Sequence, residues 1–268
     1  MTGDTVAEAP LLVERRPDGV AVLTFNLPDR RNAMSPELTE AWAAAVAELA
    51  EDRDVRAVVV TGAGRAFCAG GDLAWLAAGP DARVEELRAK MLPFYRTWLS
   101  IRRLEVPTIA AINGAAVGAG LAVALACDLR YAVPTARMSV PFTGLGIHAG
   151  MATTWLLPEV TGVAVARELL LTGRVFTGEE AVGLGVVNRT FPAESFLGDV
   201  LEVAGQIAAQ APVATRLTKV ALVDGGPASI EESLRWESLA QPVTMATDDL
   251  VEGLAAARER RRPEFRGH

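Results

Sequence analysis

The chain has 268 residues, with 26 Lys and Arg against 33 Asp and Glu, so its formal net charge is −7. This acidity argues against a groove that follows the phosphates of DNA or RNA. Two histidines and two cysteines are too few for a disulfide framework or for a zinc site away from the terminus. The chain is half hydrophobic, which is enough for a substantial core in one large domain or two small ones.

Short apolar strands alternate with helices in the first half of the chain. Val20 to Phe25 is predicted to be a strand by its β-branched content, and Pro28 to Asn32 a loop. Ser35 has the character of a cap for a helix whose apolar positions recur at helical spacing: Leu38, Trp42, Val46 and Leu49. Further strands are expected at residues 55–61, 108–112, 128–133 and 137–140, and a long helix at residues 85–103.

The last part of the chain is predicted to be helical. Helices are expected at residues 163–171, 178–184, 196–210, 214–222 and 229–258. This order predicts an α/β fold with a C-terminal helical extension. We divide it into a flexible N-terminus at residues 1–10, a core at residues 11–200 and a helical region at residues 201–268. The sequence lacks a membrane-spanning stretch and a basic signal segment, so we expect a cytoplasmic protein with no membrane partner.

Two glycine-rich segments, residues 61–73 and 113–121, each follow a predicted buried strand. A dinucleotide-binding loop would need Gly-x-Gly-x-x-Gly at the start of a helix, but Phe67 and Val123 occupy the third glycine positions. Such turns can also form an oxyanion hole, because glycine allows close approach to a ligand and a helix N-terminus offers unpaired N–H groups. The alternative is that both segments are only tight turns between strand and helix.

Several motifs occur in a recognisable order along the chain. They are residues 31–34 (RNAM), 65–73 (RAFCAGGDL), 113–120 (NGAAVGAG), 126–132 (ACDLRYA), 169–173, 180–187 and 252–263. This ordered set resembles the enoyl-CoA hydratase/isomerase (crotonase) superfamily from Leu12 onward. The resemblance implies a crotonase-like spiral of ββα units as the core and a C-terminal helical region that builds a homotrimer or a dimer of trimers. It also implies a site for an acyl-CoA thioester, with no cofactor apart from the coenzyme A of the substrate.

The resemblance further implies which residues contact the substrate. The oxyanion N–H groups would be those of Gly71 and Ala119. Arg30, Arg31 and Arg65 match positions that contact coenzyme A, where a guanidinium can pair with phosphate, and solvated loop arginines are the alternative. The other substrate-binding positions are Ala69, Asp72, Leu73, Trp75 and Phe142. Asp72 also has the character of a helix cap. Further apolar walls are expected from Leu76, Met91, Phe94, Trp98 and Trp155, for which core packing is the alternative.

The carboxylates that hydratases use are missing from this sequence. Hydration of a 2-enoyl thioester needs a base to activate water and an acid to protonate the α-carbon, and the hydratases supply both from a glutamate pair. The matching positions hold Ala122 and Phe142, and Gly150 stands where some isomerases have an aspartate. His148 lies in the loop expected to wall the acyl pocket, so we assign proton transfer to it or to a bound water. A structural hydrogen bond is the alternative role for this histidine.

The sequence therefore predicts an acyl-CoA-binding protein of the crotonase fold. Our first hypothesis is an enoyl-CoA hydratase/isomerase family enzyme, a lyase or isomerase of acyl-CoA metabolism, in which Gly71, Ala119 and His148 are catalytic. The second hypothesis is a non-catalytic acyl-CoA-binding protein on the same fold, which is motivated by the same missing carboxylates. A third hypothesis, a nicotinamide-dependent enzyme, depends on glycine content alone. No metal site and no nucleic-acid partner are expected.

Overall fold

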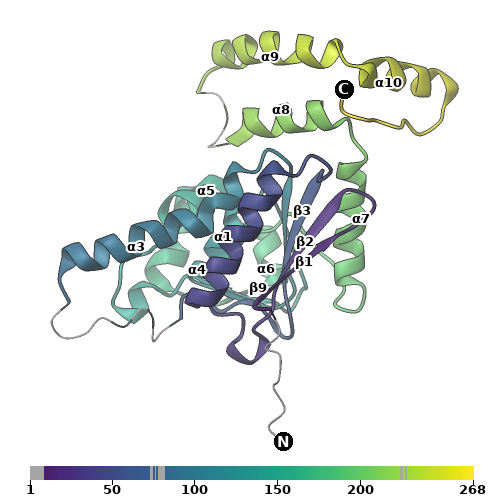
Figure 1. The fold of residues 1–268 in the computed structure, drawn as a ribbon. Helices are drawn as coiled ribbons and strands as arrows, with labels where there is room; N and C mark the ends of the chain where they lie inside the picture. The colour runs from purple at the N-terminus through teal and green to yellow at the C-terminus, as the bar shows by residue number, and fades with distance from the viewer. Residues whose placement is uncertain (1–8, 73–74, 76, 78–81, 224–225, 227) are drawn as a thin grey trace, which may run out of the picture.

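The computed structural model describes residues 9–72, 75, 77, 82–223, 226 and 228–268, and the structural statements below concern these residues. A six-stranded sheet has the order β1-β2-β3-β5-β7-β10 (Figure 1). Its strands are β1 (Leu11–Arg15), β2 (Val20–Phe25), β3 (Ala57–Gly62), β5 (Thr108–Ile112), β7 (Leu129–Ala132) and β10 (Arg189–Thr190). Only the β1–β2 pair is antiparallel, and the other neighbours in this sheet are parallel.

A second sheet has the order β4-β6-β8-β9. It is made of β4 (Ala66–Cys68), β6 (Ala115–Val117), β8 (Arg137–Ser139) and β9 (Phe176–Thr177), with a parallel arrangement from β4 to β8. The chain alternates between the sheets, since β3 is followed by β4, β5 by β6 and β7 by β8. It therefore winds as a spiral of ββα units, which confirms the predicted α/β fold class.

Helices cover the sheets and extend beyond them. They are α1 (Pro36–Glu51), α3 (Val84–Trp98), α4 (Ala119–Ala126), α5 (Thr153–Thr172), α6 (Gly178–Gly183), α7 (Phe196–Ala208), α8 (Pro212–Leu222), α9 (Ile230–Met245) and α10 (Asp248–Glu259). Three short 3-10 segments are η1 (Pro28–Arg30), η2 (Leu99–Arg103) and η3 (Thr143–Leu145). The predicted cap of α1 is confirmed, because Ser35 Oγ accepts a hydrogen bond from the N–H of Leu38 at 3.4 Å.

The structure differs from the predicted elements at several points. The helix expected at residues 229–258 is two helices, because the backbone of Thr247 is extended (φ −88°, ψ 154°). The sequence did not reveal this break, because the apolar pattern continues across Thr247. The helix expected at residues 163–171 belongs to α5, which begins at Thr153 and bends at Gly162 (φ 76°). The short strands β4, β6 and β9 did not appear as strands in the sequence, because two or three residues are too few to show an alternating pattern.

The structure can be compared with the proposed segment boundaries at residues 10 and 200. Helix α7 crosses the boundary at residue 200 and packs on β2, β3 and β5, so it belongs to the core. At the N-terminus, residues 1–8 lie outside the described residues, while the carbonyl oxygens of Ala9 and Pro10 accept hydrogen bonds from Asn26. Helices α9 and α10 stand apart from the sheets (Figure 1), while α8 contacts the core through Lys219, whose Nζ donates to the carbonyl oxygen of Val106 at 2.8 Å. None of the described helices is long and apolar enough to cross a bilayer.

Candidate active site

Two glycine turns meet at the carboxyl ends of β4 and β6. These strands are parallel neighbours, so the segments that follow them leave the same edge of the sheet. A Cβ atom on Gly70 (φ 96°) would lie 2.6 Å from the carbonyl oxygen of Val117 and 3.5 Å from the amide nitrogen of Ala119. A Cβ atom on Gly120 would lie 2.2 Å from the carbonyl oxygen of Cys68. The two turns can therefore touch only because glycine occupies both contact positions.

The turns present two unpaired N–H groups. Gly71 and Met34 form an isolated parallel bridge. The hydrogen bonds of this bridge join Met34 to the residues on either side of Gly71: Met34 N donates to Gly70 O at 2.8 Å, and Asp72 N donates to Met34 O at 3.4 Å. The N–H of Gly71 has no hydrogen-bond acceptor among the described residues. Ala119 is the first residue of α4, so its N–H has no acceptor one turn earlier. Such a pair can hold one oxygen atom that gains negative charge.

Both turns line a cavity of about 90 Å³. Of the site residues predicted from the sequence, it brings together Ala69, Gly71, Ala119, Phe142 and His148. The ring of Phe142 lies 3.7 Å from the position of a Cβ on Gly118. Among the described lining residues, only Tyr95 and His148 have a polar side chain. The cavity is therefore apolar, with two hydrogen-bonding backbone groups and two polar side chains.

His148 lies on the exposed loop at the rim of this cavity. Its Nδ1 atom is 2.7 Å from the carbonyl oxygen of Ala149. A carbonyl oxygen only accepts hydrogen bonds, so this contact assigns the hydrogen of a neutral imidazole to Nδ1 and leaves a lone pair on Nε2. The geometry places His148 beside the two turns as expected, and it also provides the structural hydrogen bond that was the alternative.

The three arginines have different surroundings. Arg30 binds Asp72 Oδ2 at 2.8 Å and Glu37 Oε1 at 2.5 Å, and these carboxylates, Asp72 most strongly, raise the pKa of Arg30 above its usual value. Arg31 and Arg65 are exposed and have no carboxylate partner in the part of the chain that the structure describes. These two side chains are therefore the better placed of the three to bind a phosphate group.

Asp72 and Trp75 connect the first turn to α3. Asp72 Oδ1 accepts a hydrogen bond from the N–H of Trp75 at 3.0 Å, as expected of a cap. The Trp75 ring packs on Phe94 at a tilt of 31°, with 4.5 Å between ring centroids, and the Lys90 ammonium lies 4.2 Å from the centroid of the Trp75 ring. Phe94 lines the cavity, while Trp75 supports it from behind. The expected contacts of Leu73 and Leu76 lie outside the described residues.

Helix α3 supplies much of the apolar wall. Met91 and Phe94 line the cavity as predicted. Trp98 instead lies in the core, stacked on Trp42 at 5.2 Å between centroids, and Trp155 on α5 is 60% exposed. Sequence reasoning missed Tyr95, which lines the cavity four residues after Met91. The helical spacing from Met91 was the signal that could have identified it.

Two asparagines of the recognised motifs brace the strand ends below the turns. Asn32 is fully buried, and its Nδ2 donates to the carbonyl oxygens of Ala66 at 2.8 Å and Ala63 at 3.0 Å, while its Oδ1 accepts from Leu27 N at 2.9 Å. Asn113 Nδ2 donates to Gly62 O at 2.7 Å, and its Oδ1 accepts from Gly62 N at 3.2 Å. Both side chains fix loop backbone rather than contact the cavity, a role that their motif positions did not reveal.

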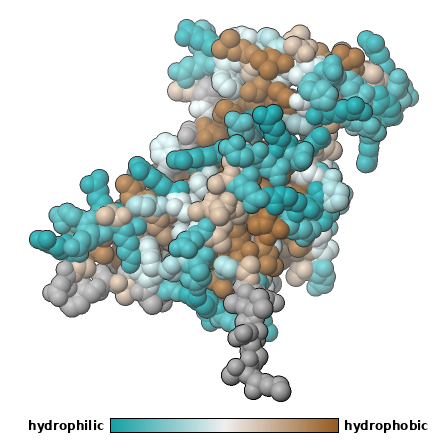
Figure 2. All heavy atoms as spheres, viewed as in Figure 1, coloured by the Kyte–Doolittle hydropathy of each residue, from teal (hydrophilic) through white to brown (hydrophobic). Residues whose placement is uncertain are grey.

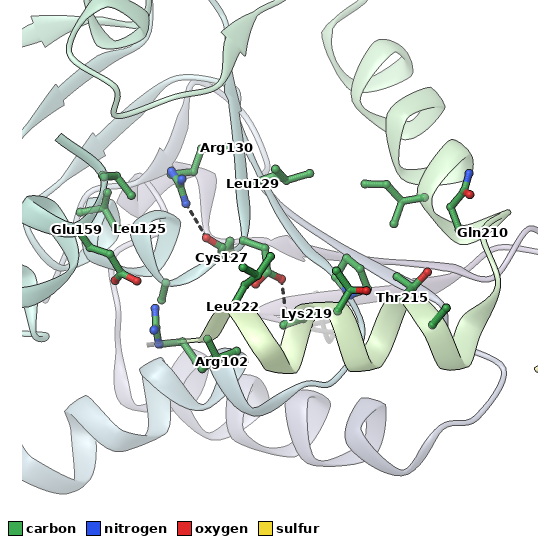
Figure 3. A pocket seen from close by; sticks show the side chains of 18 of the residues that line it. Arg102, Leu125, Cys127, Leu129, Arg130, Glu159, Gln210, Thr215, Lys219 and Leu222 are labelled. Carbon is green, nitrogen blue, oxygen red and sulfur yellow. Dashed lines mark hydrogen bonds and ion pairs between the residues drawn. The ribbon is translucent and has the colours of Figure 1, made fainter. Parts of the chain in front are cut away.

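A larger cavity of about 650 Å³ lies between α8 and the carboxyl end of α4 (Figure 3). Three of its charged groups have protein partners: Lys219 Nζ lies 2.8 Å from Asp128 Oδ2, and Arg130 Nη1 donates to Cys127 O at 2.6 Å. Cys127 follows α4 at the end opposite to Ala119, and eight residues of helix span about 12 Å. This cavity is thus separate from the two turns. No group of three or more metal-ligating side chains occurs among the described residues.

Fold and site together define a class of proteins: a ββα spiral in which two glycine turns direct backbone N–H groups into an apolar cavity. The family model for enoyl-CoA hydratase/isomerase matches residues 15–268, and the chain belongs to this family. It is 38% identical to the mitochondrial enoyl-CoA hydratase domain-containing protein 2 of Bos taurus over 259 residues, covering 93% of this chain and 85% of that protein.

Solved structures agree with this assignment. The chain is similar to an enoyl-CoA hydratase from Bacillus anthracis with a TM-score of 0.90 and 33% identity, covering 97% of this chain and all of that one. An enoyl-CoA hydratase from Mycobacterium smegmatis gives a TM-score of 0.88 and 32% identity, covering 96% of this chain and 99% of that one. The predicted resemblance and the crotonase-like spiral are therefore confirmed.

Proposed function

We propose that the protein binds an acyl-CoA or enoyl-CoA thioester and processes it as an enzyme. The observation that carries the proposal is the pair of unpaired N–H groups, on Gly71 and Ala119, at one cavity. Both would donate to the thioester oxygen and stabilise the enolate that forms when a proton leaves the α-carbon or when water adds to the β-carbon. Loss of one such donor costs about 2.7–4 kcal/mol in other enzymes, so the pair can supply a large part of the barrier reduction.

Proton transfer in this proposal differs from that of a glutamate pair. The positions of the two glutamates are apolar here: Ala122 is fully buried in α4, and Phe142 lines the cavity. His148 would take the proton of a water molecule through Nε2, because its Nδ1 hydrogen is directed to the Ala149 carbonyl oxygen. The thioester could be hydrated or isomerised with this arrangement, since both reactions pass through an enolate.

We propose that Arg31 and Arg65 bind the phosphates of coenzyme A. Both are exposed and lie at the first turn: Arg31 O accepts a hydrogen bond from Ala69 N at 3.0 Å, and Arg65 is the residue before β4. Arg30 would instead orient Asp72 through their ion pair. The phosphates would thus lie outside the cavity, with the thioester directed inward.

We also propose that the C-terminal helices form the contacts of a homotrimer or a dimer of trimers. Ile230 is 81% exposed, Leu239 71% and Val251 69%, and apolar surface gathers over α8 and α9 (Figure 2). Burying such side chains against another subunit would gain roughly 1.5–3 kcal/mol for each large one. Light scattering at several protein concentrations tests this proposal, and a monomer throughout would refute it.

The proposed activity can be tested with purified protein and 2-enoyl-CoA thioesters from crotonyl-CoA to long chains. We expect hydration, seen as loss of the conjugated enoyl absorbance, and a lowered C=O stretching frequency of bound hexanoyl-CoA, because two N–H groups would polarise the carbonyl. Binding with the lowered frequency but without turnover at any chain length would favour the alternative, a non-catalytic acyl-CoA-binding protein. Absence of binding in calorimetry would refute both proposals.

A further inference from the structure

Tyr95 places a hydroxyl group at the cavity beside the two glycine turns. It lies on α3 one turn after Met91, and both residues line the same cavity as Gly71 and Ala119. Its side chain is half-buried, and burial raises the pKa of Tyr95 above its usual value. The phenol therefore keeps its proton at neutral pH and can donate it, whereas it cannot act as a base there.

The hydroxyl fills the space that a side chain at residue 150 would enter. A Cβ atom on Gly150 would lie 2.5 Å from Tyr95 Oη and 3.0 Å from Cζ. The backbone at Gly150 is held locally, because its carbonyl oxygen accepts hydrogen bonds from Thr153 N at 3.1 Å and Thr153 Oγ1 at 2.6 Å. Gly150 and Tyr95 are therefore complementary: the glycine makes room for the phenol at the wall of the cavity.

The hydroxyl is available to a ligand. Tyr95 Oη forms no hydrogen bond with any residue that the structure describes, so a ligand in the cavity would not have to displace a protein partner from it. His148 is the other described lining residue with a polar side chain, and its Nε2 is left as an acceptor. The cavity thus holds one side-chain donor and one side-chain acceptor.

We propose that the Tyr95 hydroxyl is the proton donor of this site and protonates the α-carbon of the bound thioester. This inference rests on the proposed function, because it needs the enolate held by Gly71 and Ala119. In hydration, water oxygen bonds to the β-carbon, the released proton goes to His148 Nε2, and the π electrons move to form the enolate. The Oη–H bond of Tyr95 then breaks, the enolate electron pair forms the C–H bond at the α-carbon, and the carbonyl re-forms. The imidazolium returns its proton to the phenolate through water, so one water is added overall.

The test compares Tyr95→Phe with Tyr131→Phe, the same change at the other tyrosine of the chain. Tyr131 lies on β7 with its ring against Phe191, and it does not line the cavity. We expect Tyr95→Phe to lower kcat for hydration of crotonyl-CoA or a longer 2-enoyl-CoA by about 100-fold or more, the usual contribution of a positioned acid. Its Kd for hexanoyl-CoA, measured by calorimetry, should equal that of the wild type. Tyr131→Phe should resemble the wild type in both measurements.

Gly150→Ala gives a second perturbation that leaves the phenol in the chain. Its methyl group would displace Oη, so we expect the same loss of kcat, and no further loss when Tyr95→Phe is added. A Tyr95→Phe enzyme with wild-type kcat would overturn the inference, and so would equal losses of kcat and binding, which would indicate a structural role. Wild-type protein that binds hexanoyl-CoA without hydrating any enoyl-CoA would refute the proton donor while leaving binding intact. Wild-type protein that binds no acyl-CoA would refute the proposed function itself.

Discussion

The contact between the two glycine turns can be disturbed by one methyl group. In Gly120→Ala the new Cβ would lie 2.2 Å from the carbonyl oxygen of Cys68, 2.8 Å from its carbonyl carbon and 2.9 Å from its Cβ. Observed Cβ contacts are not shorter than 3.0 Å, so α4 and the end of β4 must separate by about 0.8 Å or more. All three contacted atoms belong to the buried residue Cys68, so no flexible side chain can yield.

This separation moves the N–H of Ala119 away from that of Gly71. A misplacement of about 1 Å can cost 100-fold in rate, so we expect Gly120→Ala to lower kcat for 2-enoyl-CoA hydration by about that factor. The C=O stretching frequency of bound hexanoyl-CoA should shift toward its value in water, because one hydrogen bond lengthens. Overpacking should also lower the free energy of unfolding by about 1–3 kcal/mol in urea titrations.

The control is Gly198→Ala on α7, where the new methyl group meets no atom within 4 Å. This variant should keep kcat and gain about 0.5–1 kcal/mol in the free energy of unfolding, because alanine favours a helix more than glycine does. Wild-type kcat and an unchanged C=O frequency in a folded Gly120→Ala protein would refute the argument that the turn contact sets the oxyanion geometry.

Three other predictions concern the surroundings of the site. Asn32→Ala should lower the free energy of unfolding in urea by about 3–4 kcal/mol, because the Leu27 N–H and the Ala63 and Ala66 carbonyls lose their partner; a loss under about 1 kcal/mol would contradict this role. Burial raises the pKa of both Cys68 and Cys127 to about 12 from 9.0, so neither thiol should react with Ellman's reagent in native protein at pH 8, and both should react in urea. Rapid labelling of the native protein would contradict this burial. Since the folded protein holds these thiol protons more tightly than the unfolded chain, the free energy of unfolding should fall as the pH rises from 9 toward 12. Arg31→Ala and Arg65→Ala should each weaken binding of hexanoyl-CoA by about twofold to fivefold, as expected for exposed ion pairs, without changing binding of hexanoyl-pantetheine, which lacks the phosphates. Arg53→Ala, at another exposed arginine, should leave both unchanged; equal weakening for both ligands would remove the phosphate role.

The sequence determined the class of fold and the position of the turns. Strands β2 and β5 have the predicted bounds, because runs of β-branched and apolar residues record burial directly. The helix cap at Ser35 was also predictable from the sequence, because capping depends on residues that are close together in the chain. Ordered motifs were sufficient to identify the family, and the absence of carboxylates at Ala122, Phe142 and Gly150 is visible in the sequence itself.

Only the tertiary structure decided which side chains share the cavity. Trp98 and Tyr95 lie three residues apart on α3, yet one joins Trp42 in the core and the other reaches Gly150, because the helix packs between two different environments. Arg30 and Arg31 are neighbours, but the fold pairs Asp72 with Arg30 and not with Arg31. These outcomes depend on distances between residues far apart in the chain, which local spacing does not encode. The chain carries 33 acidic residues, but none of those that the structure describes lines the cavity at the two turns, where the polar side chains are His148 and Tyr95.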